Sequence, residues 1–226
     1  MRQRKTPTTN ASWPELEPGL GTLLQQGCAA LQVAVEPRQQ QQLLEYLALL
    51  SRWNQAYNLT AVRDQAQMVT RHVLDSLAIA PLLTGQRVLD VGTGAGLPGV
   101  PLALLFPQRE FHLLDSNGKK TRFLFQVKTA LCLDNMVVHQ ARVDAFRSTE
   151  LFDTVVSRAF ASLQDMVHGC RHLLHPAGRI LAMKGAYPVQ ELAAVGPECA
   201  DIVVHPLRVP GLDEQRHLVE IALRQG

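Results

Sequence analysis

Residues Val88–Gly99 read VLDVGTGAGLPG, and this stretch decides the fold. It opens with the apolar residues Val88, Leu89 and Val91, a run that is typical of a buried parallel strand. Four glycines follow within eight residues: Gly92, Gly94, Gly96 and Gly99. Glycine lets the backbone turn sharply and approach a ligand closely, and Pro98 suits the first turn of a helix. Strand, loop and helix together predict the first unit of a nucleotide-binding α/β fold.

Two carboxylates indicate what this loop would bind. Asp90 lies just before the loop, where its charge would repel the pyrophosphate of a dinucleotide and suit a cationic ligand. Asp115 ends the next predicted strand, Phe111–Leu114, and is placed to bind ribose hydroxyls. One acid for a cationic amino-acid group and one for a ribose fit S-adenosylmethionine. The literal G-x-G-x-x-G at 94–99 also fits an NAD-binding protein, and a turn that binds nothing is a third interpretation.

Charged residues recur where further predicted strands end. These strands are Met136–His139, Asp153–Val156, Arg179–Met183, Val203–Arg208 and Leu218–Leu223. Asp144 follows the first of them, in the loop expected beside an adenine ring. Arg158 follows the second and Lys184 the third. Because ligands of such sheets lie beyond the carboxyl ends of the strands, these residues are expected to share one site with Asp90 and Asp115.

The composition sets limits on the class of protein. With 226 residues, 46% of them hydrophobic, the chain suffices for one domain with an extension. A net charge of +2 and a pI near 8.4 allow nucleic-acid binding through a local patch. Four scattered cysteines and no membrane-length apolar run predict a cytoplasmic protein without a membrane span. His168, His172 and His175 lack spaced carboxylate or cysteine ligands, so we expect no metal, and we expect a monomer.

The first 84 residues are expected to precede the nucleotide-binding domain, 85–226, or to form one unit with it. Residues 1–20 read as a disordered basic tail, either solvated or touching RNA. Residues 21–84 read as a helical extension, with a helix at Gly21–Val35 and a stronger one into which the glutamine run Gln39–Gln42 leads. Its Leu43, Tyr46, Leu47, Leu50 and Trp53 recur at helical spacing.

Two segments of the extension are less regular. The segment 53–64, WNQAYNLTAVRD, is rich in residues that favour turns and caps. In the helix that follows, Arg71 and Asp75 are four apart and could form a surface ion pair. A second interpretation turns His72, Asp75 and Ser76 toward the glycine loop.

The helix at 116–130, SNGKKTRFLFQVKTA, combines a buried apolar face with four cations: Lys119, Lys120, Arg122 and Lys128. These residues either form a phosphate-binding patch or an ordinary solvated face.

Several motifs together resemble one family. They are WNQAYNLTAVRD, RHVLDSL, LDVGTGAGLPGVPLA, LLDSNGKKTRFL, VVSRAFASL and MKG, between about Gln40 and the C-terminus. In this combination they look like the signatures of the bacterial 16S rRNA guanine-N(7) methyltransferases, the RsmG or glucose-inhibited division protein B family. The resemblance implies a class I S-adenosylmethionine-dependent methyltransferase fold. It also implies methylation of one guanine of 16S rRNA, free or in the small ribosomal subunit, near the decoding centre.

The resemblance also implies roles for particular residues. Gly92 and Leu97 would contact the cofactor, Val143 and Asp144 would flank its adenine, and Arg158 would line the pocket. Asp144 stands where glutamate is usual in the family, which shortens that contact by one methylene. Because guanine N7 carries no proton, no general base is assigned, and Arg158 and Lys184 are expected to orient the substrate. The alternatives are a small-molecule or protein methyltransferase, an NAD-binding oxidoreductase and a cofactor-binding RNA-interaction protein without catalysis.

Overall fold

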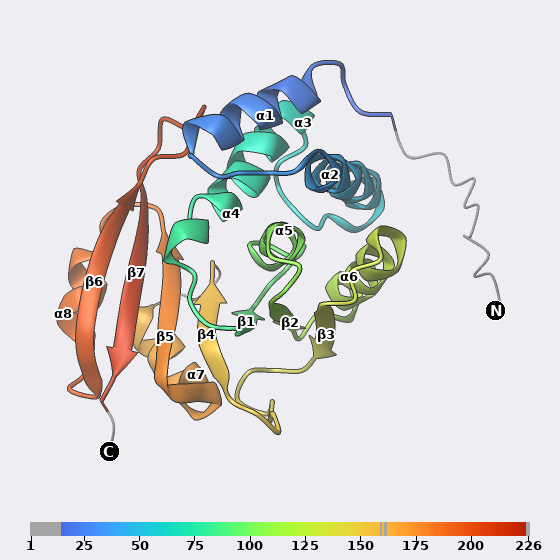
Figure 1. The fold of residues 1–226 in the computed structure, drawn as a ribbon. Helices are drawn as coiled ribbons and strands as arrows, with labels where there is room; N and C mark the ends of the chain where they lie inside the picture. Colours follow the sequence, from blue (N-terminus) through green and yellow to red (C-terminus); the bar gives the residue numbers. More distant parts are fainter. Residues whose placement is uncertain (1–14, 159, 161, 225–226) are drawn as a thin grey trace.

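The structure is a computed structural model that describes residues 15–158, 160 and 162–224. Within these residues, seven strands form one sheet in the order β3-β2-β1-β4-β5-β7-β6 (Figure 1). Their bounds are β1 Arg87–Val91, β2 Glu110–Asp115, β3 Met136–Gln140, β4 Phe152–Ser157, β5 Leu174–Lys184, β6 Cys199–Leu207 and β7 Arg216–Leu223. The first five are paired in parallel, whereas β7 is antiparallel to β5 and β6. The predicted mostly parallel α/β sheet is confirmed.

The parallel pairing brings the carboxyl ends of the strands to one edge of the sheet. Asp90 in β1 is in register with Leu113 in β2 and Val156 in β4. Asp115 ends β2 and Lys184 ends β5. The shared edge that the sequence predicted for these residues is therefore present.

Helices cover both faces of the sheet. Along β1, Val88 belongs to one hydrophobic cluster and its neighbour Leu89 to the other, as the alternation of a strand requires. Residues of α5 (Gly99–Leu105) and α6 (Gly118–Leu131) pack in the cluster of Val88. Residues of α7 (Leu163–Cys170) and α8 (Val189–Ala194) pack in the cluster of Leu89, on the other side (Figure 1).

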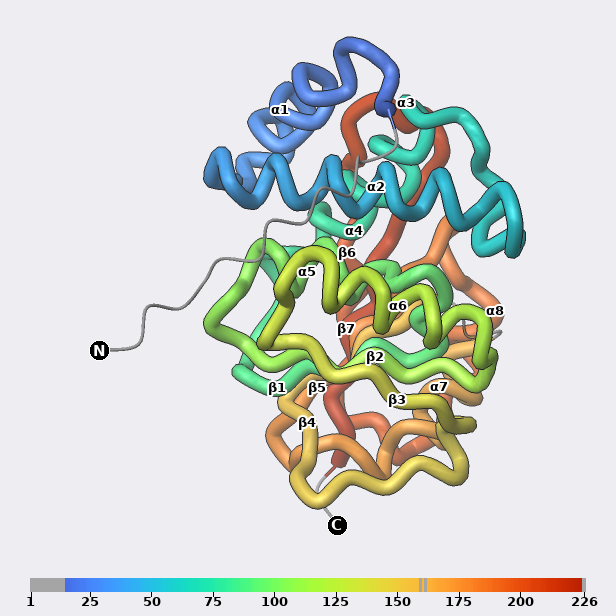
Figure 2. The backbone as a smooth tube through the Cα atoms, turned by 90° about the vertical axis from the view of Figure 1, so that its right-hand side faces the viewer, coloured from blue at the N-terminus to red at the C-terminus, as the bar shows by residue number. Residues whose placement is uncertain are grey.

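A further helical layer lies outside α5 and α6 (Figure 2). It consists of α1 Leu20–Ala30, α2 Pro37–Tyr57, α3 Gln65–Met68 and α4 Asp75–Leu77, with a short 3-10 turn at Ala80–Leu82. Leu43 and Leu47 of α2 are buried in the same cluster as Val100 of α5 and Phe123 of α6. This shared core favours the expectation that 21–84 and 85–226 form one unit. Of the predicted tail, residues 1–14 lie outside the described part.

The first helix is shorter than predicted. The sequence favoured a helix over Gly21–Val35, but α1 ends at Ala30. Gln32 has a left-handed backbone, with φ of 57°, and Pro37 disfavours helical geometry in the residue before it. Glu36 and Gln39 then form a reciprocal capping box at the start of α2, which takes the glutamine run into the helix.

The polar segment 53–64 makes the predicted caps and turns. Asn58 closes α2 in a left-handed conformation, and the Asp64 carboxylate accepts the backbone N–H of Gln67 at the start of α3. The side chain of Asn54 is buried and holds the turn, donating to the Val62 carbonyl and accepting the N–H of Thr60. These bonds fix the path of the segment.

The helix after this segment is not a continuous α-helix. Residues Val69–Leu74 form a π-helical segment between α3 and α4. Such segments are uncommon and occur often at functional sites. This one carries Arg71 and His72, and Asp75 follows it directly.

Candidate active site

The glycine loop uses left-handed backbone conformations, which favour glycine. Gly92, Gly94 and Gly96 all have positive φ, between 62° and 92°. The Gly92 N–H donates to the Leu114 carbonyl over 2.8 Å, and the Gly94 N–H donates to Asp115 Oδ2 over 2.9 Å. The loop is thus tied to the end of β2.

Close packing also requires glycine at Gly96 and Gly99. A Cβ on Gly96 would lie 2.4 Å from Val100 Cγ2, and one on Gly99 would lie 2.7 Å from Asp90 Oδ2. Leu97, expected at the cofactor, is 3% exposed and belongs to the core. These three residues shape the loop from beneath.

Asp90 also lies beneath the loop, and not in a cavity. Its side chain is fully buried, and its Oδ2 accepts from Thr93 Oγ1 over 2.6 Å and from the Gly99 N–H over 2.8 Å. Among the described residues Oδ1 has no hydrogen-bond partner, and burial raises the pKa of Asp90 to about 6. Asp90 therefore anchors the loop through Thr93 and Gly99, and its expected contact with a ligand stays a prediction.

A second anchor comes from the helical layer. The hydroxyl of Tyr46 in α2 donates to the Ala95 carbonyl over 2.8 Å, and its side chain is completely buried. Burial holds the pKa of Tyr46 above its usual range, so the hydroxyl stays a donor. Helix α2 is therefore part of the support of the loop.

The first cavity opens above the loop and has a volume of about 460 Å³. It is lined by Val91, Gly92, Leu114, Asp115, Ser116, Lys120, Ala141, Arg142, Val143 and Phe160. Asp115 Oδ1 accepts the Asn117 N–H and keeps a second lone pair, while Oδ2 also faces Lys120 Nζ at 3.5 Å. A carboxylate in this position can accept a ribose hydroxyl, and the contact of Asp115 with a ribose stays a prediction.

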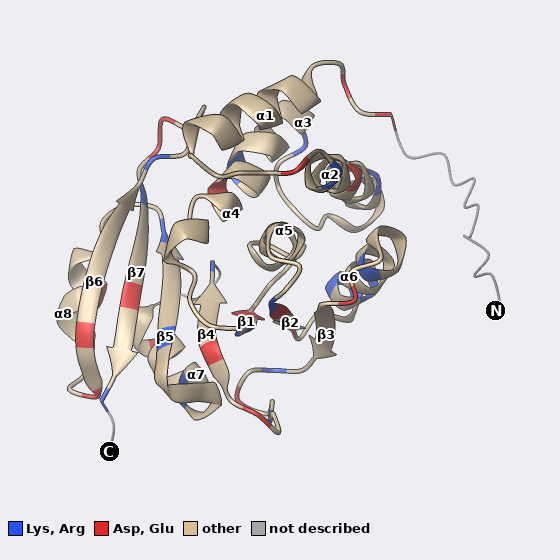
Figure 3. Cartoon of the chain, viewed as in Figure 1, with Lys and Arg blue, Asp and Glu red and all other residues tan. Residues whose placement is uncertain are grey.

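Two residues near this cavity have surroundings that the sequence did not predict. Val143 lines it as expected, but the side chain of Asp144 is 63% exposed and pairs with Arg142 Nε at 3.3 Å. Lys120, expected among the RNA-binding cations, lines the cavity beside Asp115. Of the other three cations on α6, Lys119 and Arg122 are exposed and Lys128 is half-buried; Figure 3 marks the positions of basic residues on this helix in blue.

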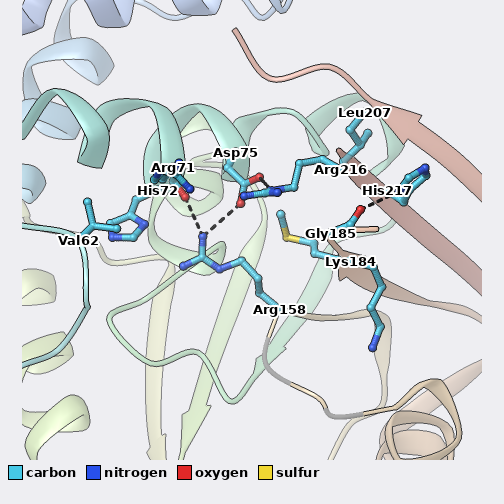
Figure 4. A pocket seen from close by; sticks show the side chains of 11 residues that line it. Val62, Arg71, His72, Asp75, Arg158, Lys184, Gly185, Leu207, Arg216 and His217 are labelled. Atoms are coloured by element: carbon cyan, nitrogen blue, oxygen red, sulfur yellow. Dashed lines mark hydrogen bonds and ion pairs between the residues drawn. The ribbon is translucent and has the colours of Figure 1, made fainter. Parts of the chain in front are cut away.

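The second cavity lies at the ends of β4, β5 and β7 and has a volume of about 380 Å³ (Figure 4). It is lined by Val62, Arg71, His72, Asp75, Arg158, Met183, Lys184, Gly185, Leu207, Arg216 and His217. Arg158, expected at the cofactor, lies here and is not among the residues lining the first cavity. Phe160, two residues on, lines the first cavity, so the chain after β4 borders both.

A buried carboxylate organises this second cavity. Asp75 is 3% exposed; its Oδ2 accepts from Arg158 Nη1 over 3.2 Å, and its Oδ1 accepts from Arg216 Nε over 3.0 Å. Arg158 Nη1 also donates to the Arg71 carbonyl. The predicted Arg71–Asp75 pair is wrong, because Arg71 instead pairs with Glu214. The guanidinium groups of Arg158 and Arg216 are thus held in place at the wall of the cavity by Asp75.

His72 and Lys184 both have partners within the protein, which limits their availability to a ligand. Burial and the nearby charge of Arg158 lower the pKa of His72 to about 4, so the imidazole is neutral at pH 7. Its Nε2 hydrogen-bonds with Thr60 Oγ1. Lys184 Nζ pairs with Glu191 at 2.7 Å. Ser76 is fully buried, and its hydroxyl donates to the His72 carbonyl.

Among the residues that line the two cavities and received no site role from the sequence are the basic residues Arg142, Arg216 and His217 and the aromatic Phe160. Arg142 and Phe160 had a signal, since both follow predicted strand ends. Arg216 and His217 start a strand, and nothing local indicates that an antiparallel strand would bring its first residues to this edge. Within the described residues, no group of three histidine, cysteine or acidic side chains is placed to hold a metal. The helices described there also include none long and apolar enough to cross a membrane.

The fold and the paired cavities define the class of protein. A crystal structure of TrmN from Thermus thermophilus matches with a TM-score of 0.51 and 20% identity, covering 69% of this chain and 53% of that one. A predicted O-methyltransferase from Agrobacterium tumefaciens matches with a TM-score of 0.54 and 22% identity, covering 67% and 81%. The fold is that of the class I S-adenosylmethionine-dependent methyltransferases.

The sequence comparisons identify the family within this class. The family model GidB, rRNA small subunit methyltransferase G, matches residues 39–219. Ribosomal RNA small subunit methyltransferase G of Saccharophagus degradans is 52% identical, over 89% of this chain and 91% of that protein. The protein of the same name from Pseudomonas aeruginosa is 55% identical, over 87% and 92%. The chain belongs to this family of rRNA methyltransferases.

Proposed function

We propose that the protein transfers the methyl group of S-adenosylmethionine to N7 of one guanine in 16S rRNA, near the decoding centre. The substrate is free 16S rRNA or the small ribosomal subunit, which places the reaction in the cytoplasm. The observation that carries the proposal is the pair of cavities at one sheet edge. One has a glycine loop and a carboxylate, and the other has arginines oriented by Asp75.

The first cavity fits the cofactor. Its volume of about 460 Å³ lies within the range of about 300–1,000 Å³ that is usual for small-molecule sites. A Cβ added to Gly94 would meet no atom closer than 3.9 Å, so the space above the loop is open. Asp115 would accept the ribose hydroxyls, and Val143 and Phe160 would contact the adenine. When bound, S-adenosylmethionine supplies a methyl group on a positively charged sulfur, which a lone pair can attack.

The second cavity fits a piece of RNA. Arg158 and Arg216 lie at its wall beside a single carboxylate that both already contact. Their remaining N–H groups can donate to phosphate or base oxygens. Lys119, Arg122 and Lys128 on α6 would add non-specific phosphate contacts.

The residues around the second cavity favour a reaction without a general base. Guanine N7 carries a lone pair and no proton at neutral pH, so nothing has to be deprotonated. His72 is a weak base, and both oxygens of Asp75 are occupied by arginines. What the chain must do is hold the acceptor nitrogen in line with the methyl group, which can contribute several kcal/mol.

Two measurements test the proposal. Equilibrium dialysis should show binding of labelled S-adenosylmethionine and none of NAD. Incubation with 16S rRNA or small subunits from cells that lack this protein should place label at one guanine N7, located by cleavage mapping. Label in protein, or at another position of the base, would refute the acceptor; NAD binding would refute the cofactor.

A further inference from the structure

The end of α2 and the segment that joins it to α3, residues 57–64, have two sides with different surroundings. Toward the interior, Val62 lines the second cavity, and Thr60 hydrogen-bonds with His72 in that cavity's wall. Toward the exterior, Tyr57, Asn58 and Arg63 are exposed. The proposed function uses the inner side and leaves the outer side without a role.

Tyr57 presents an aromatic ring that is supported from behind. Its ring is packed on Trp53 with centroids 5.1 Å apart and an interplanar angle of 33°. Trp53 in turn packs on Phe123 of α6, with centroids 5.6 Å apart. Tyr57 nevertheless remains 45% exposed. An aromatic ring that is fixed by packing and open to solvent can stack on a base without a large loss of conformational freedom.

A cation is bound to the residue that follows this ring in the chain. Arg63 Nη2 donates to Asn58 Oδ1 over 3.0 Å, and Asn58 directly follows Tyr57. Among the described residues, no carboxylate forms an ion pair with Arg63, so its charge is available to an anion. Lys119 and Arg122 lie on α6, the helix on which Trp53 packs. A ring with a neighbouring guanidinium matches a nucleotide, which offers a flat base and a phosphate.

We propose that Tyr57 and Arg63 form a binding site for one unpaired nucleotide of the RNA substrate. The base stacks on Tyr57 and the phosphate is contacted by Arg63, while the target guanine occupies the second cavity behind Val62. The site rests on the proposed function for the identity of the RNA. It gives the 53–64 segment a part in substrate recognition besides its structural turns.

The test compares variants that keep or remove the aromatic face. Tyr57→Leu retains an apolar side chain without a π-face, and Tyr57→Phe retains the ring. Leu151→Ala is the matched control, since Leu151 is 41% exposed and directly precedes β4, at the amino edge of the sheet. For each variant, methylation is measured against the concentration of 16S rRNA from cells lacking this protein. S-adenosylmethionine affinity and melting temperature are measured alongside.

We expect Tyr57→Leu to raise the KM for rRNA about tenfold, the effect of losing one stacked base. Its kcat, cofactor affinity and melting temperature should stay close to those of the parent, as should all values for Tyr57→Phe and Leu151→Ala. Arg63→Gln should also raise the KM and make its dependence on salt shallower, by about 0.7 in the logarithmic slope. A KM for Tyr57→Leu equal to that of the parent would overturn the inference, as would an equal rise for Tyr57→Phe.

Filter binding of the same rRNA separates this inference from the proposed function. If the parent does not methylate rRNA, the proposed function fails. The weaker rRNA binding of Tyr57→Leu relative to Tyr57→Phe would still support the site, and equal binding would refute it. If the parent methylates rRNA and the two variants behave alike, the nucleotide site alone is wrong.

Discussion

Asp90 lies in a buried environment that the sequence did not predict. Its pKa is raised to about 6 by burial, against an ordinary value of 3.8. A carboxyl group whose pKa is raised in the folded protein binds its proton more tightly there, so stability falls as the pH rises from about 4 to 6. The difference of roughly two pKa units corresponds to a cost of about 3 kcal/mol at neutral pH.

We therefore expect Asp90→Asn to stabilise the cofactor-free protein at pH 7–8 relative to the parent. Asn retains an oxygen that can accept from Thr93 and Gly99, and it carries no buried charge. Urea unfolding at several pH values would show the gain growing between about pH 4 and 7, by up to about 3 kcal/mol. A gain or loss that does not vary with pH would contradict the raised pKa.

His72 leads to a prediction about the reaction. Its pKa is lowered to about 4, so it keeps the same neutral form at every pH above about 5. We expect the single-turnover methylation rate at saturating rRNA and cofactor to be flat between about pH 6 and 9. A limb in this range that disappears in His72→Gln would show that His72 acts as a base after all.

At the scale of single elements, α6 separates two kinds of cation. Lys119 and Arg122 are exposed, whereas Lys120 faces Asp115. Replacing Lys119 and Arg122 together by Ala should reduce the logarithmic salt dependence of RNA binding by about 1.4–1.8. Lys120→Ala is the control from the same helix and should alter cofactor affinity instead. An unchanged salt slope in the double variant would assign these cations to an ordinary solvated surface.

Helix α2 leads to a second prediction at this scale. Tyr46→Phe removes the hydroxyl that donates to the buried Ala95 carbonyl. A buried carbonyl without a hydrogen-bond donor lowers the stability of the folded protein by about 1–3 kcal/mol. We expect weaker binding of S-adenosylmethionine, measured by calorimetry, in a variant that still folds. If only the melting temperature falls and the affinity is unchanged, Tyr46 supports the fold and not the loop.

At the scale of the whole molecule, the parts that were predictable rest on local patterns. The strand, the glycine loop and Asp115 follow from apolar runs and glycine spacing, and all three were placed correctly. The network of Asp75 was not predictable, since Arg216 lies 141 residues away from it and no local pattern encodes that pairing. The side of α6 on which Lys120 lies depends in the same way on how the helix packs.

The shared hydrophobic core also bears on the division at residue 84. Leu43, Leu47 and Leu50 of α2 are almost fully buried in the cluster that contains α5 and α6. A fragment of residues 85–226 would expose its side of this cluster to water. We expect that fragment to aggregate or to lack a cooperative thermal transition, which calorimetry would show; a sharp transition with retained cofactor binding would establish an independent domain.

The bond from Tyr46 to Ala95 has a consequence for the order in which ligands bind. Tyr46 and Tyr57 lie on the same helix, one beside the cofactor loop and the other beside the proposed nucleotide site. Ordering either end of α2 lowers the entropic cost of ordering the other, so the two ligands should bind cooperatively. S-adenosylhomocysteine has no methyl group to transfer, so its binding can be measured together with rRNA. Thermodynamic reciprocity then requires rRNA to raise the affinity for S-adenosylhomocysteine by the same factor by which S-adenosylhomocysteine raises the affinity for rRNA. Tyr46→Phe should reduce that factor toward one in both titrations, and the release of either product would become independent of the other.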